Sequence, residues 1–125
     1  GRLRCVQEIS AVTAACMMVK TSVFKAVGGF DEELKVAFND IDLCMKVRKY
    51  GVKIVFTPYA ELYHYESKSR GMEDTPEKQL RFSREVNCFR RKWERELLKG
   101  DPYYNPNLTL NNTDCSLRKQ EKNGD

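Results

Sequence analysis

The segment that decides the fold, residues 28–51, reads GGFDEELKVAFNDIDLCMKVRKYG. Asn39 and Asp40 belong to the residue types that begin helices, because their side chains accept a hydrogen bond from a free backbone N–H. Four residues at helical spacing form one inner stripe: Leu43, Cys44, Val47 and Tyr50. A helix is therefore predicted from Asn39 or Asp40 up to Gly51, since glycine accepts the left-handed conformation that ends helices.

The residues before this segment predict a strand followed by a short helix. Residues 9–19 are small, β-branched or apolar, which favours a buried strand over a helix. Residues 20–22 offer a turn and a helix start, and apolar residues at helical spacing follow at 23–27. The pair Gly28-Gly29 is expected to end this helix, and residues 30–34 to form an irregular acidic loop.

The residues after Gly51 predict shorter elements. Residues 52–56 are strand-like, and Pro58 prevents this strand from continuing as a central ladder element. Residues 61–66 alternate between polar and apolar and predict a further short strand. That strand would lead into residues 67–71, a flexible basic loop by composition.

A long helix gives the strongest periodic signal in the chain. It is predicted to begin after Asp74 or Thr75, with Pro76 at its first position, and to end at Gly100. Its apolar stripe consists of Phe82, Val86, Phe89, Trp93 and Leu97. Residues 111–125 are polar and turn-rich, so they are expected to be a disordered tail after a domain portion at 1–110.

Composition and charge narrow the classes of protein. At 125 residues the chain holds one domain at most, and Leu, Ile, Val and Phe make up about 23% of it, enough for a modest core. No apolar run approaches the ~20 residues that cross a bilayer, so neither a transmembrane nor a secretion segment is expected. Five widely spaced cysteines without a Cys-x-x-Cys pair favour reduced thiols in a cytoplasmic protein.

The net charge of +4 is unevenly placed. Residues 76–99 alone hold eight basic and four acidic side chains. A basic helix of this kind either faces an anionic partner, such as nucleic acid or a membrane surface, or is simply solvated.

The order of these features resembles the later half of a family 2 glycosyltransferase. The resemblance covers residues 11–71 and rests on Gly-Gly-Phe-Asp-Glu at 28–32, Asn-Asp-Ile-Asp-Leu-Cys at 39–44, and the later Gly51, Pro58 and His64. Residues 101–108, Asp-Pro-Tyr-Tyr-Asn-Pro-Asn-Leu, are similar to the segment that ends many bacterial members. The resemblance implies an α/β class, as the later part of a GT-A-like nucleotide-sugar transferase fold with a mixed sheet, flanking helices and a long C-terminal helix.

Members of that family are typically inverting, so an acceptor hydroxyl attacks the anomeric carbon while a carboxylate takes its proton. The resemblance assigns this base to Asp40 and acceptor binding to Gly29, Asp31, Asn39 and Asp42. Asn39 departs from the more common Glu, which removes one negative charge beside the base. By pattern alone, helix capping is the simpler explanation of Asn39 and Asp40.

Metal and diphosphate binding are also implied by the resemblance. His64, the only histidine, is expected to help ligate Mg or Mn, and Lys68 and Arg70 to contact the donor diphosphate from a closing loop. The alternative is that His64 has no role in binding and lies on a half-exposed strand beside an ordinary turn. Asp40 and Asp42 also fit an Asp-x-Asp metal motif, but at the start of a helix they point about 200° apart, so that interpretation is rejected.

The full-length protein is therefore expected to move a sugar from a nucleotide-sugar donor to a saccharide or lipid-linked acceptor. The resemblance places this in cell-surface polysaccharide or glycoconjugate synthesis, in the cytoplasm or peripherally at the inner face of the membrane, with no nucleic-acid partner. These 125 residues lack the donor half, so by themselves they should be inactive, and a second copy would be needed to cover apolar surface around residues 11–19. Two alternatives stay open: a noncatalytic basic module for nucleic acid or anionic membranes, and a degenerate relative kept for protein interactions.

Overall fold

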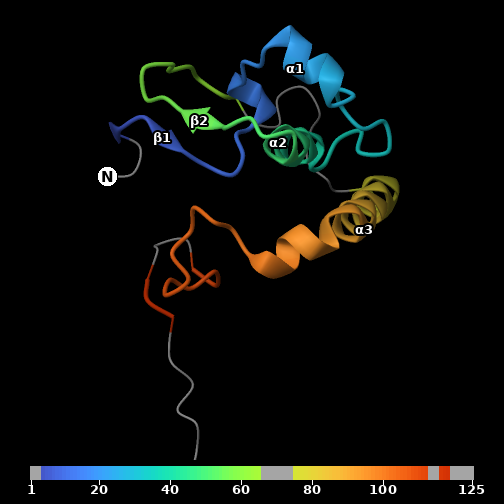
Figure 1. Ribbon diagram of the computed structural model, residues 1–125. Helices are drawn as coiled ribbons and strands as arrows, with labels where there is room; N and C mark the ends of the chain where they lie inside the picture. Colours follow the sequence, from blue (N-terminus) through green and yellow to red (C-terminus); the bar gives the residue numbers. More distant parts are fainter. Residues whose placement is uncertain (1–3, 66–74, 113–115, 119–125) are drawn as a thin grey trace, which may run out of the picture.

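A computed structural model describes residues 4–65, 75–112 and 116–118 of the chain (Figure 1). Its elements are, in order, β1 (Gln7–Glu8), the 3-10 helix η2 (Ala14–Cys16), α1 (Thr21–Ala26), α2 (Asn39–Lys49), β2 (Val55–Phe56) and α3 (Pro76–Lys99). Helices and a small sheet occur together, as an α/β class requires. Neither this mixture nor the sheet identifies the larger nucleotide-sugar transferase fold, which stays a prediction.

The sheet of the described residues has two short antiparallel strands. Gln7 lies opposite Phe56 and Glu8 opposite Val55, and the Ile9 N–H extends the pairing by donating to the Ile54 carbonyl (3.1 Å). The prediction of a mixed sheet is not met in this part of the chain. Residues 52–56 contribute only their last two positions, and residues 61–65 form no strand.

The predicted strand at residues 9–19 is wrong. β1 ends at Glu8, and residues 14–16 instead form η2, where the Ala15 N–H donates to the Thr13 hydroxyl (3.3 Å). An apolar, β-branched run favours a strand only if another strand lies alongside to accept its backbone hydrogen bonds. Because β2 has two residues, β1 finds a partner for the same length only, and the cap supplied by Thr13 favours a helical turn at residues 14–16.

Helix α1 ends where the glycine pair predicts. Gly28 and Gly29 both have positive φ, +80° and +64°, and the Gly29 N–H donates to the Phe24 carbonyl (2.9 Å). A Cβ at Gly29 would lie 3.0 Å from the Phe24 ring. Position 29 therefore requires glycine for its backbone conformation and for space.

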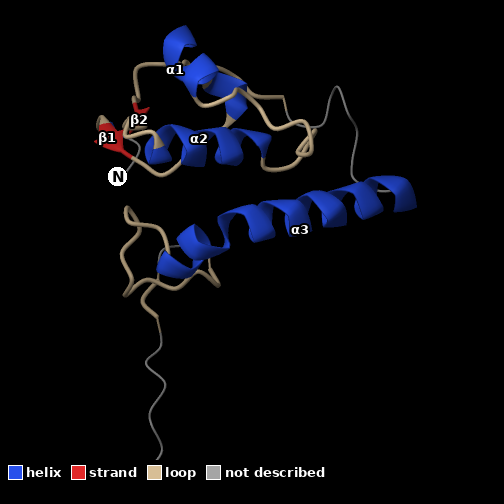
Figure 2. Ribbon diagram, turned by 45° about the vertical axis from the view of Figure 1, so that its right-hand side comes forward, coloured by secondary structure: helices blue, strands red, loops and turns tan. Residues whose placement is uncertain are grey.

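Helix α2 begins at Asn39, as predicted, and packs against α3 (Figure 2). Leu43, Cys44 and Val47 are buried, which confirms three positions of the inner stripe. Tyr50 is 59% exposed and was wrongly placed in that stripe. It follows the last helical residue, Lys49, where the chain turns away through Gly51.

Helix α3 has the bounds that its sequence signals predict. The Lys78 N–H donates to the Thr75 hydroxyl (3.4 Å) at its start, and Gly100 ends it with φ +76°. The stripe is confirmed at Phe89 and Trp93, which are buried, whereas Phe82 and Leu97 are about half exposed. Trp93 has a non-helical backbone (φ −115°, ψ 19°), so the helix bends there. Leu97, beyond the bend, is therefore not buried with Phe89 and Trp93.

The core lies between α2, α3 and the loop before α2. Its buried members are Leu34, Phe89 and Trp93, with Phe38, Ile41, Met45 and Cys88 packed partly buried around them. Downstream of α3, Leu108 and Leu117 form an isolated antiparallel bridge. None of the described helices is long and apolar enough to span a membrane.

Candidate functional site

Asp40, the predicted base, is the second residue of α2 and is half-buried. Its Oδ2 accepts a hydrogen bond from the Ala14 N–H in η2 (3.1 Å), and its Oδ1 accepts one from the Ile41 N–H (2.8 Å). The carboxylate therefore ties the start of α2 to the N-terminal segment. Each carboxylate oxygen has a second lone pair, so these bonds leave acceptor capacity for a substrate proton.

Asn39 caps the backbone beside this carboxylate. Its Oδ1 accepts from the Asp40 N–H (2.7 Å), which satisfies one of the free N–H groups at the start of α2. Asn39 is the first residue of α2 and not its N-cap, which is Phe38 without a side-chain cap, so the capping interpretation of Asn39 holds only for this one N–H. A role for Asn39 toward an acceptor stays a prediction.

The residue before Asn39 has an unusual backbone. Phe38 is the one described non-glycine residue with positive φ (62°, ψ 7°), a left-handed conformation that costs roughly 1–2 kcal/mol in a side-chain-bearing residue. Its ring stacks on Phe89 with centroids 5.1 Å apart and contacts Phe82 at 6.0 Å. Contacts from α3 therefore hold the turn from which Asn39 and Asp40 project.

A buried carboxylate of α3 holds the same turn. Glu85 is 3% exposed, and its Oε2 accepts a hydrogen bond from the Ala37 N–H (2.6 Å). Together Glu85 and the stacked Phe38 ring fix the two residues that precede Asn39. Sequence reasoning missed both residues, because an acid inside a helical stripe and a left-handed phenylalanine are recognisable only once the tertiary contacts are known.

Asp42 is completely buried and faces α3 rather than the side of Asp40. Its Oδ1 accepts from the Trp93 indole N–H (2.8 Å) and lies 2.8 Å from Lys92 Nζ. Its Oδ2 lies 3.1 Å from Lys46 Nζ and accepts no further hydrogen bond within the described residues. Asp40 and Asp42 thus contact different parts of the chain, in agreement with the rejection of a paired metal motif.

Asp31 and Gly29 belong to the same cluster. Asp31 pairs with Lys92 and also accepts from the Glu33 N–H (3.0 Å), and the Gly29 carbonyl accepts from Lys46 Nζ. Gly29, Asp31 and Asp42, three of the four residues predicted to bind the acceptor, are therefore held together by two lysines. We call Asp31, Asp42, Lys46, Lys92 and Trp93 the lysine–aspartate cluster.

The titration behaviour of this cluster follows from its pairing. The hydrogen bond from Lys92, followed by that from the Glu33 N–H, lowers the pKa of Asp31 below its usual value. Burial of Lys92 disfavours its charge, but hydrogen bonds to Asp31 and Asp42 outweigh this effect and raise its pKa. The contacts of Lys92 with Asp31 and Asp42, and of Lys46 with Asp42 and the Gly29 carbonyl, join the Gly29–Asp31 turn to α2 and α3.

The sequence held usable signals for this cluster. Asp42 and Lys46 are four residues apart on a helix, the spacing of an ion pair. A buried tryptophan usually finds an acceptor for its indole N–H, so Trp93 called for a polar partner. No local pattern in the sequence predicts the pairing of Lys92, because its partners Asp42 and Asp31 lie 50 and 61 residues away in the chain.

Cys44 is another buried group next to the site. Its thiol donates to the Val12 carbonyl (3.7 Å) and accepts from the Val12 N–H (3.5 Å), and burial raises its pKa. It packs α2 against the N-terminal segment that contacts Asp40. A neutral, buried thiol of this kind is a packing group rather than a nucleophile.

Of the residues predicted for metal and diphosphate, the structure describes only His64. His64 is exposed in the loop that follows β2. Lys68 and Arg70 lie outside the described residues. Within the described part of the chain, no group of three or more His, Cys, Asp or Glu side chains is arranged to hold a metal ion.

Comparison with known proteins adds relatives but no structural match. No protein-family model and no solved structure matches the chain. It is 58% identical over 117 residues to the uncharacterized protein y4gI of Sinorhizobium fredii, an alignment that covers 93% of this chain and 13% of that protein. It is 39% identical over 115 residues to the O-antigen biosynthesis protein RfbC of Myxococcus xanthus, covering 92% of this chain and 9% of that protein.

A third relative has a named activity. The N-acetylglucosaminyl-diphospho-decaprenol L-rhamnosyltransferase of Mycobacterium tuberculosis is 36% identical over 67 residues, which is 54% of this chain and 22% of that protein. The chain thus spans only a minor part of each of these relatives, between 9% and 22% of their lengths. Their names support a glycosyltransferase relationship and a connection with polysaccharide synthesis.

Proposed function

We propose that this chain is part of an inverting family 2 glycosyltransferase and that Asp40 is its catalytic base. The observation that carries the proposal is the placement of Asp40: a half-buried carboxylate at the start of α2, held by the Ala14 N–H and by a left-handed turn that α3 fixes. A base must be held within hydrogen-bond reach of the proton it takes, and these contacts supply that rigidity. The similarity to a rhamnosyltransferase supports the same reaction class.

In the proposed reaction the acceptor hydroxyl donates its hydrogen bond to the Asp40 carboxylate. The hydroxyl oxygen forms a bond to the anomeric carbon while the bond from that carbon to the phosphate oxygen breaks. The electron pair of the broken bond leaves with the nucleoside diphosphate, and the hydroxyl proton passes to Asp40.

A divalent metal, Mg or Mn, would neutralise the leaving diphosphate, but the described residues do not form its site. His64 is the one predicted ligand among them, and it is exposed and belongs to no group of three or more potential ligands within the described residues. Asp42, which shares the Asp-x-Asp pattern with Asp40, is already paired with two lysines. We therefore assign no step of the reaction to a metal held by these residues.

For the substrates we propose a nucleotide-sugar donor and an acceptor that is a saccharide or is linked to a lipid diphosphate. The name of the mycobacterial relative describes transfer of L-rhamnose to such a lipid-linked sugar. The proposed setting is synthesis of a cell-surface polysaccharide, on the cytoplasmic side of the membrane. The name of the Myxococcus xanthus relative supports the same setting.

The donor site is proposed to lie in residues that this chain does not contain. The described part leaves large apolar side chains exposed in β2 and in the loop after it, at Val55, Tyr59, Leu62 and Tyr63, and also before α1, at Met18. An apolar surface of this extent is normally covered by another part of a protein. We therefore expect the 125 residues alone to show no sugar transfer, and measurable turnover by them would contradict this part of the proposal.

The direct test is Asp40→Asn in the full-length protein. The amide cannot accept the proton, so the rate of sugar transfer should fall by roughly 10²–10⁴-fold, whereas binding of the nucleotide sugar should be unchanged. The measurements are product formation at saturating donor and calorimetric titration of the donor. The matched control is Glu77→Gln, which neutralises an exposed carboxylate in the first turn of α3 and should retain full activity.

Retention of turnover in Asp40→Asn would refute Asp40 as the base. Loss of both transfer and donor binding would instead indicate a folding defect. Circular dichroism of the variant separates these two cases.

A further inference from the structure

The outward side of α3 carries four arginines that have no ion-pair partner in the described part of the chain: Arg84, Arg90, Arg91 and Arg95. Several other cations on the two helices are paired: Lys46 and Lys92 with Asp42, Lys49 with Glu96, and Arg81 with Glu85. We call these four arginines the arginine face. The difference concentrates uncompensated positive charge on one side of the helix.

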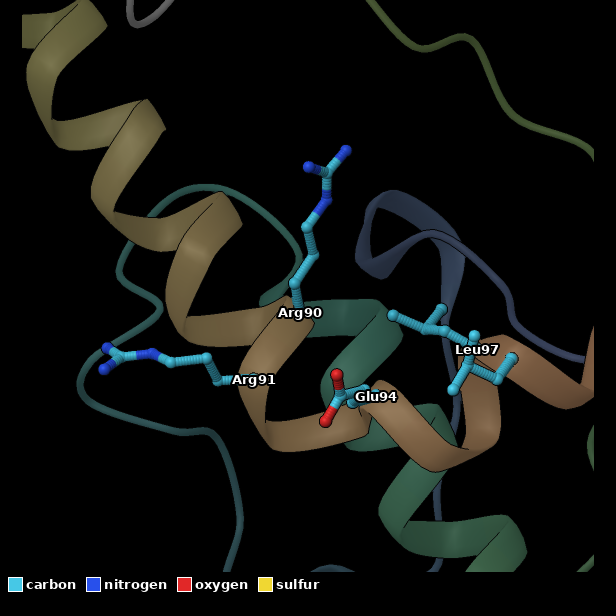
Figure 3. Close-up of a pocket in the computed structure, with 5 residues that line it drawn as sticks. Arg90, Arg91, Glu94 and Leu97 are labelled. Carbon is cyan, nitrogen blue, oxygen red and sulfur yellow. The ribbon is translucent and has the colours of Figure 1, made fainter.

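The surface of the arginine face is open and partly apolar. One shallow depression is lined by Arg84, Asn87, Arg90 and Arg91, and an adjoining one by Arg90, Arg91, Glu94, Leu97 and Leu98. In the close-up, Arg90 and Arg91 extend away from the helix in different directions (Figure 3). Leu98 is 82% exposed and Leu97 45%, so large apolar side chains lie beside the guanidinium groups.

We propose that the arginine face docks on an anionic lipid bilayer, with its guanidinium groups on lipid phosphates and Leu98 at the boundary between headgroups and acyl chains. Arginine binds phosphate oxygens with two parallel hydrogen bonds, and a cluster of four or more Lys or Arg side chains on a helix is typical of a surface that binds anionic lipid headgroups. The inference rests on the proposed function, because a lipid-linked acceptor is presented at a membrane surface. The inference goes beyond that function by naming the part of the chain that contacts the membrane.

The structure favours lipid over nucleic acid as the occupant. Proteins that hold single-stranded nucleic acid commonly stack bases on exposed aromatic rings. The aromatic residues of α3 from Arg84 onward are Phe89 and Trp93, and both are buried on the opposite side of the helix. The exposed apolar side chains beside the arginines are instead Leu97 and Leu98, which cannot stack on bases as aromatic rings do.

Docking also leaves the candidate site intact. The buried side of α3 contacts Phe38 through Phe89, and Ala37 through Glu85. The arginine face lies on the other side of the helix, so binding a membrane requires no change in the contacts that hold Asp40. Neutralising these arginines should therefore leave transfer to a water-soluble acceptor unchanged.

The experiment is co-sedimentation of the full-length protein with vesicles of phosphatidylethanolamine and phosphatidylglycerol, compared with vesicles of phosphatidylcholine alone. The test variant carries Arg84→Gln, Arg90→Gln, Arg91→Gln and Arg95→Gln. Each arginine contributes on the order of fivefold to partitioning onto an anionic surface, so the variant should bind roughly 10²–10³-fold more weakly. The wild type should bind anionic vesicles and leave phosphatidylcholine vesicles unbound.

The matched control removes the same total charge from other exposed positions: Arg4→Gln, Lys20→Gln, Lys25→Gln and Lys35→Gln. It should retain most of the anionic-vesicle binding. Equal losses in the two variants would mean that net charge alone attracts the protein to lipid, and would overturn the assignment of the face. If the quadruple arginine variant fails to fold, Glu94→Gln tests the same assignment. Removing this acid from beside the arginines should strengthen binding to anionic vesicles several-fold, and unchanged binding would overturn the proposal.

A second arm separates lipid from nucleic acid. Leu98→Ser should weaken binding to anionic vesicles and have no effect on retention by single-stranded DNA or RNA. Tight, arginine-dependent binding to nucleic acid that is insensitive to Leu98→Ser, without vesicle binding, would overturn the proposal. No sugar nucleotide enters these assays, so loss of transfer in Asp40→Asn with intact vesicle binding, or the reverse, tells which of the two proposals fails.

Discussion

The helix pair α2–α3 and the β1–β2 sheet differ in how much of their apolar surface is covered. The pair contains five of the six buried apolar side chains: Leu43, Cys44, Val47, Phe89 and Trp93; the sixth, Leu34, lies in the loop before α2. The sheet has two residues in each strand, and Val55 is half exposed. Within the described residues, the two helices contain buried apolar side chains, whereas the two strands contain none.

The two regions also use charge differently. The helix pair buries Asp42 and Glu85 and supplies each with partners from another part of the chain. The sheet relies on exposed pairs, such as Lys53 with Glu8. Exposed pairs contribute little to stability because water screens them, whereas a buried charge that loses its partner is strongly destabilising. Asp40, the candidate base, lies on α2 and so belongs to the region in which the loss of a single buried contact lowers stability most.

The largest effect is expected from Asp42→Ala. The substitution leaves Lys46 and Lys92 without their buried carboxylate and the Trp93 indole without its acceptor. Breaking a buried pair in this way should lower the free energy of unfolding by about 3–5 kcal/mol. Urea denaturation of the full-length protein, followed by Trp93 fluorescence, measures it. The control Glu32→Ala removes an exposed acid and should change stability by no more than about 0.5 kcal/mol.

Glu85→Ala should have a smaller effect that reaches Asp40. The Ala37 N–H loses its acceptor, and an unsatisfied buried donor costs about 1–3 kcal/mol. The left-handed turn at Phe38 then loosens, so amide exchange at Asn39, Asp40 and Ile41 should become faster and the rate of sugar transfer should fall.

Glu85→Gln serves as the matched variant, because its amide oxygen can still accept from Ala37. It should restore slow exchange and most of the transfer rate. Equal behaviour of the alanine and glutamine variants would show that Glu85 acts through its charge and not by holding the turn.

Local sequence signals were enough for the helices of this comparison. Thr75, Pro76 and Gly100 mark the ends of α3, and the glycine pair marks the end of α1, because caps and glycines act on neighbouring backbone groups. The strand predicted at residues 9–19 failed for the opposite reason. A strand depends on a partner strand, and the sequence of one segment does not contain that information.

The candidate site was predictable in part. The Asn39-Asp40 pair was found because its residue types begin helices and its spacing from the glycine pair is distinctive. The burial of Asp42 and the left-handed Phe38 were not predictable, since both depend on contacts with α3 about 50 residues away. Tertiary contacts therefore decide the surroundings of the base, whereas the local sequence decides its position on the helix.

The smallest effect compares an acid bound to each region: Asp31, which pairs with Lys92 of α3 from the loop before α2, and Glu8 of the sheet. Hydrogen bonds from Lys92 and the Glu33 N–H lower the pKa of Asp31, and those from Lys53 and Tyr103 lower the pKa of Glu8. A carboxyl whose pKa is lower in the folded state stabilises the fold above its unfolded pKa, about 4, and this stabilisation is lost as pH falls through the folded value. Both Asp31→Asn and Glu8→Gln should therefore reduce stability at neutral pH and flatten its loss in acid.

The two substitutions should differ in how much they reduce the loss of stability in acid. Asp31 is joined through Lys92 to the buried Asp42, whereas Glu8 is exposed to screening by water and salt. Acid titrations monitored by circular dichroism, at low and at high salt, should show a clear effect for Asp31→Asn at both salt concentrations. The effect of Glu8→Gln should disappear at high salt. An equal, salt-resistant effect at Glu8 would mean that the sheet is covered in the full-length protein, and that the contrast between the two regions belongs to these 125 residues alone.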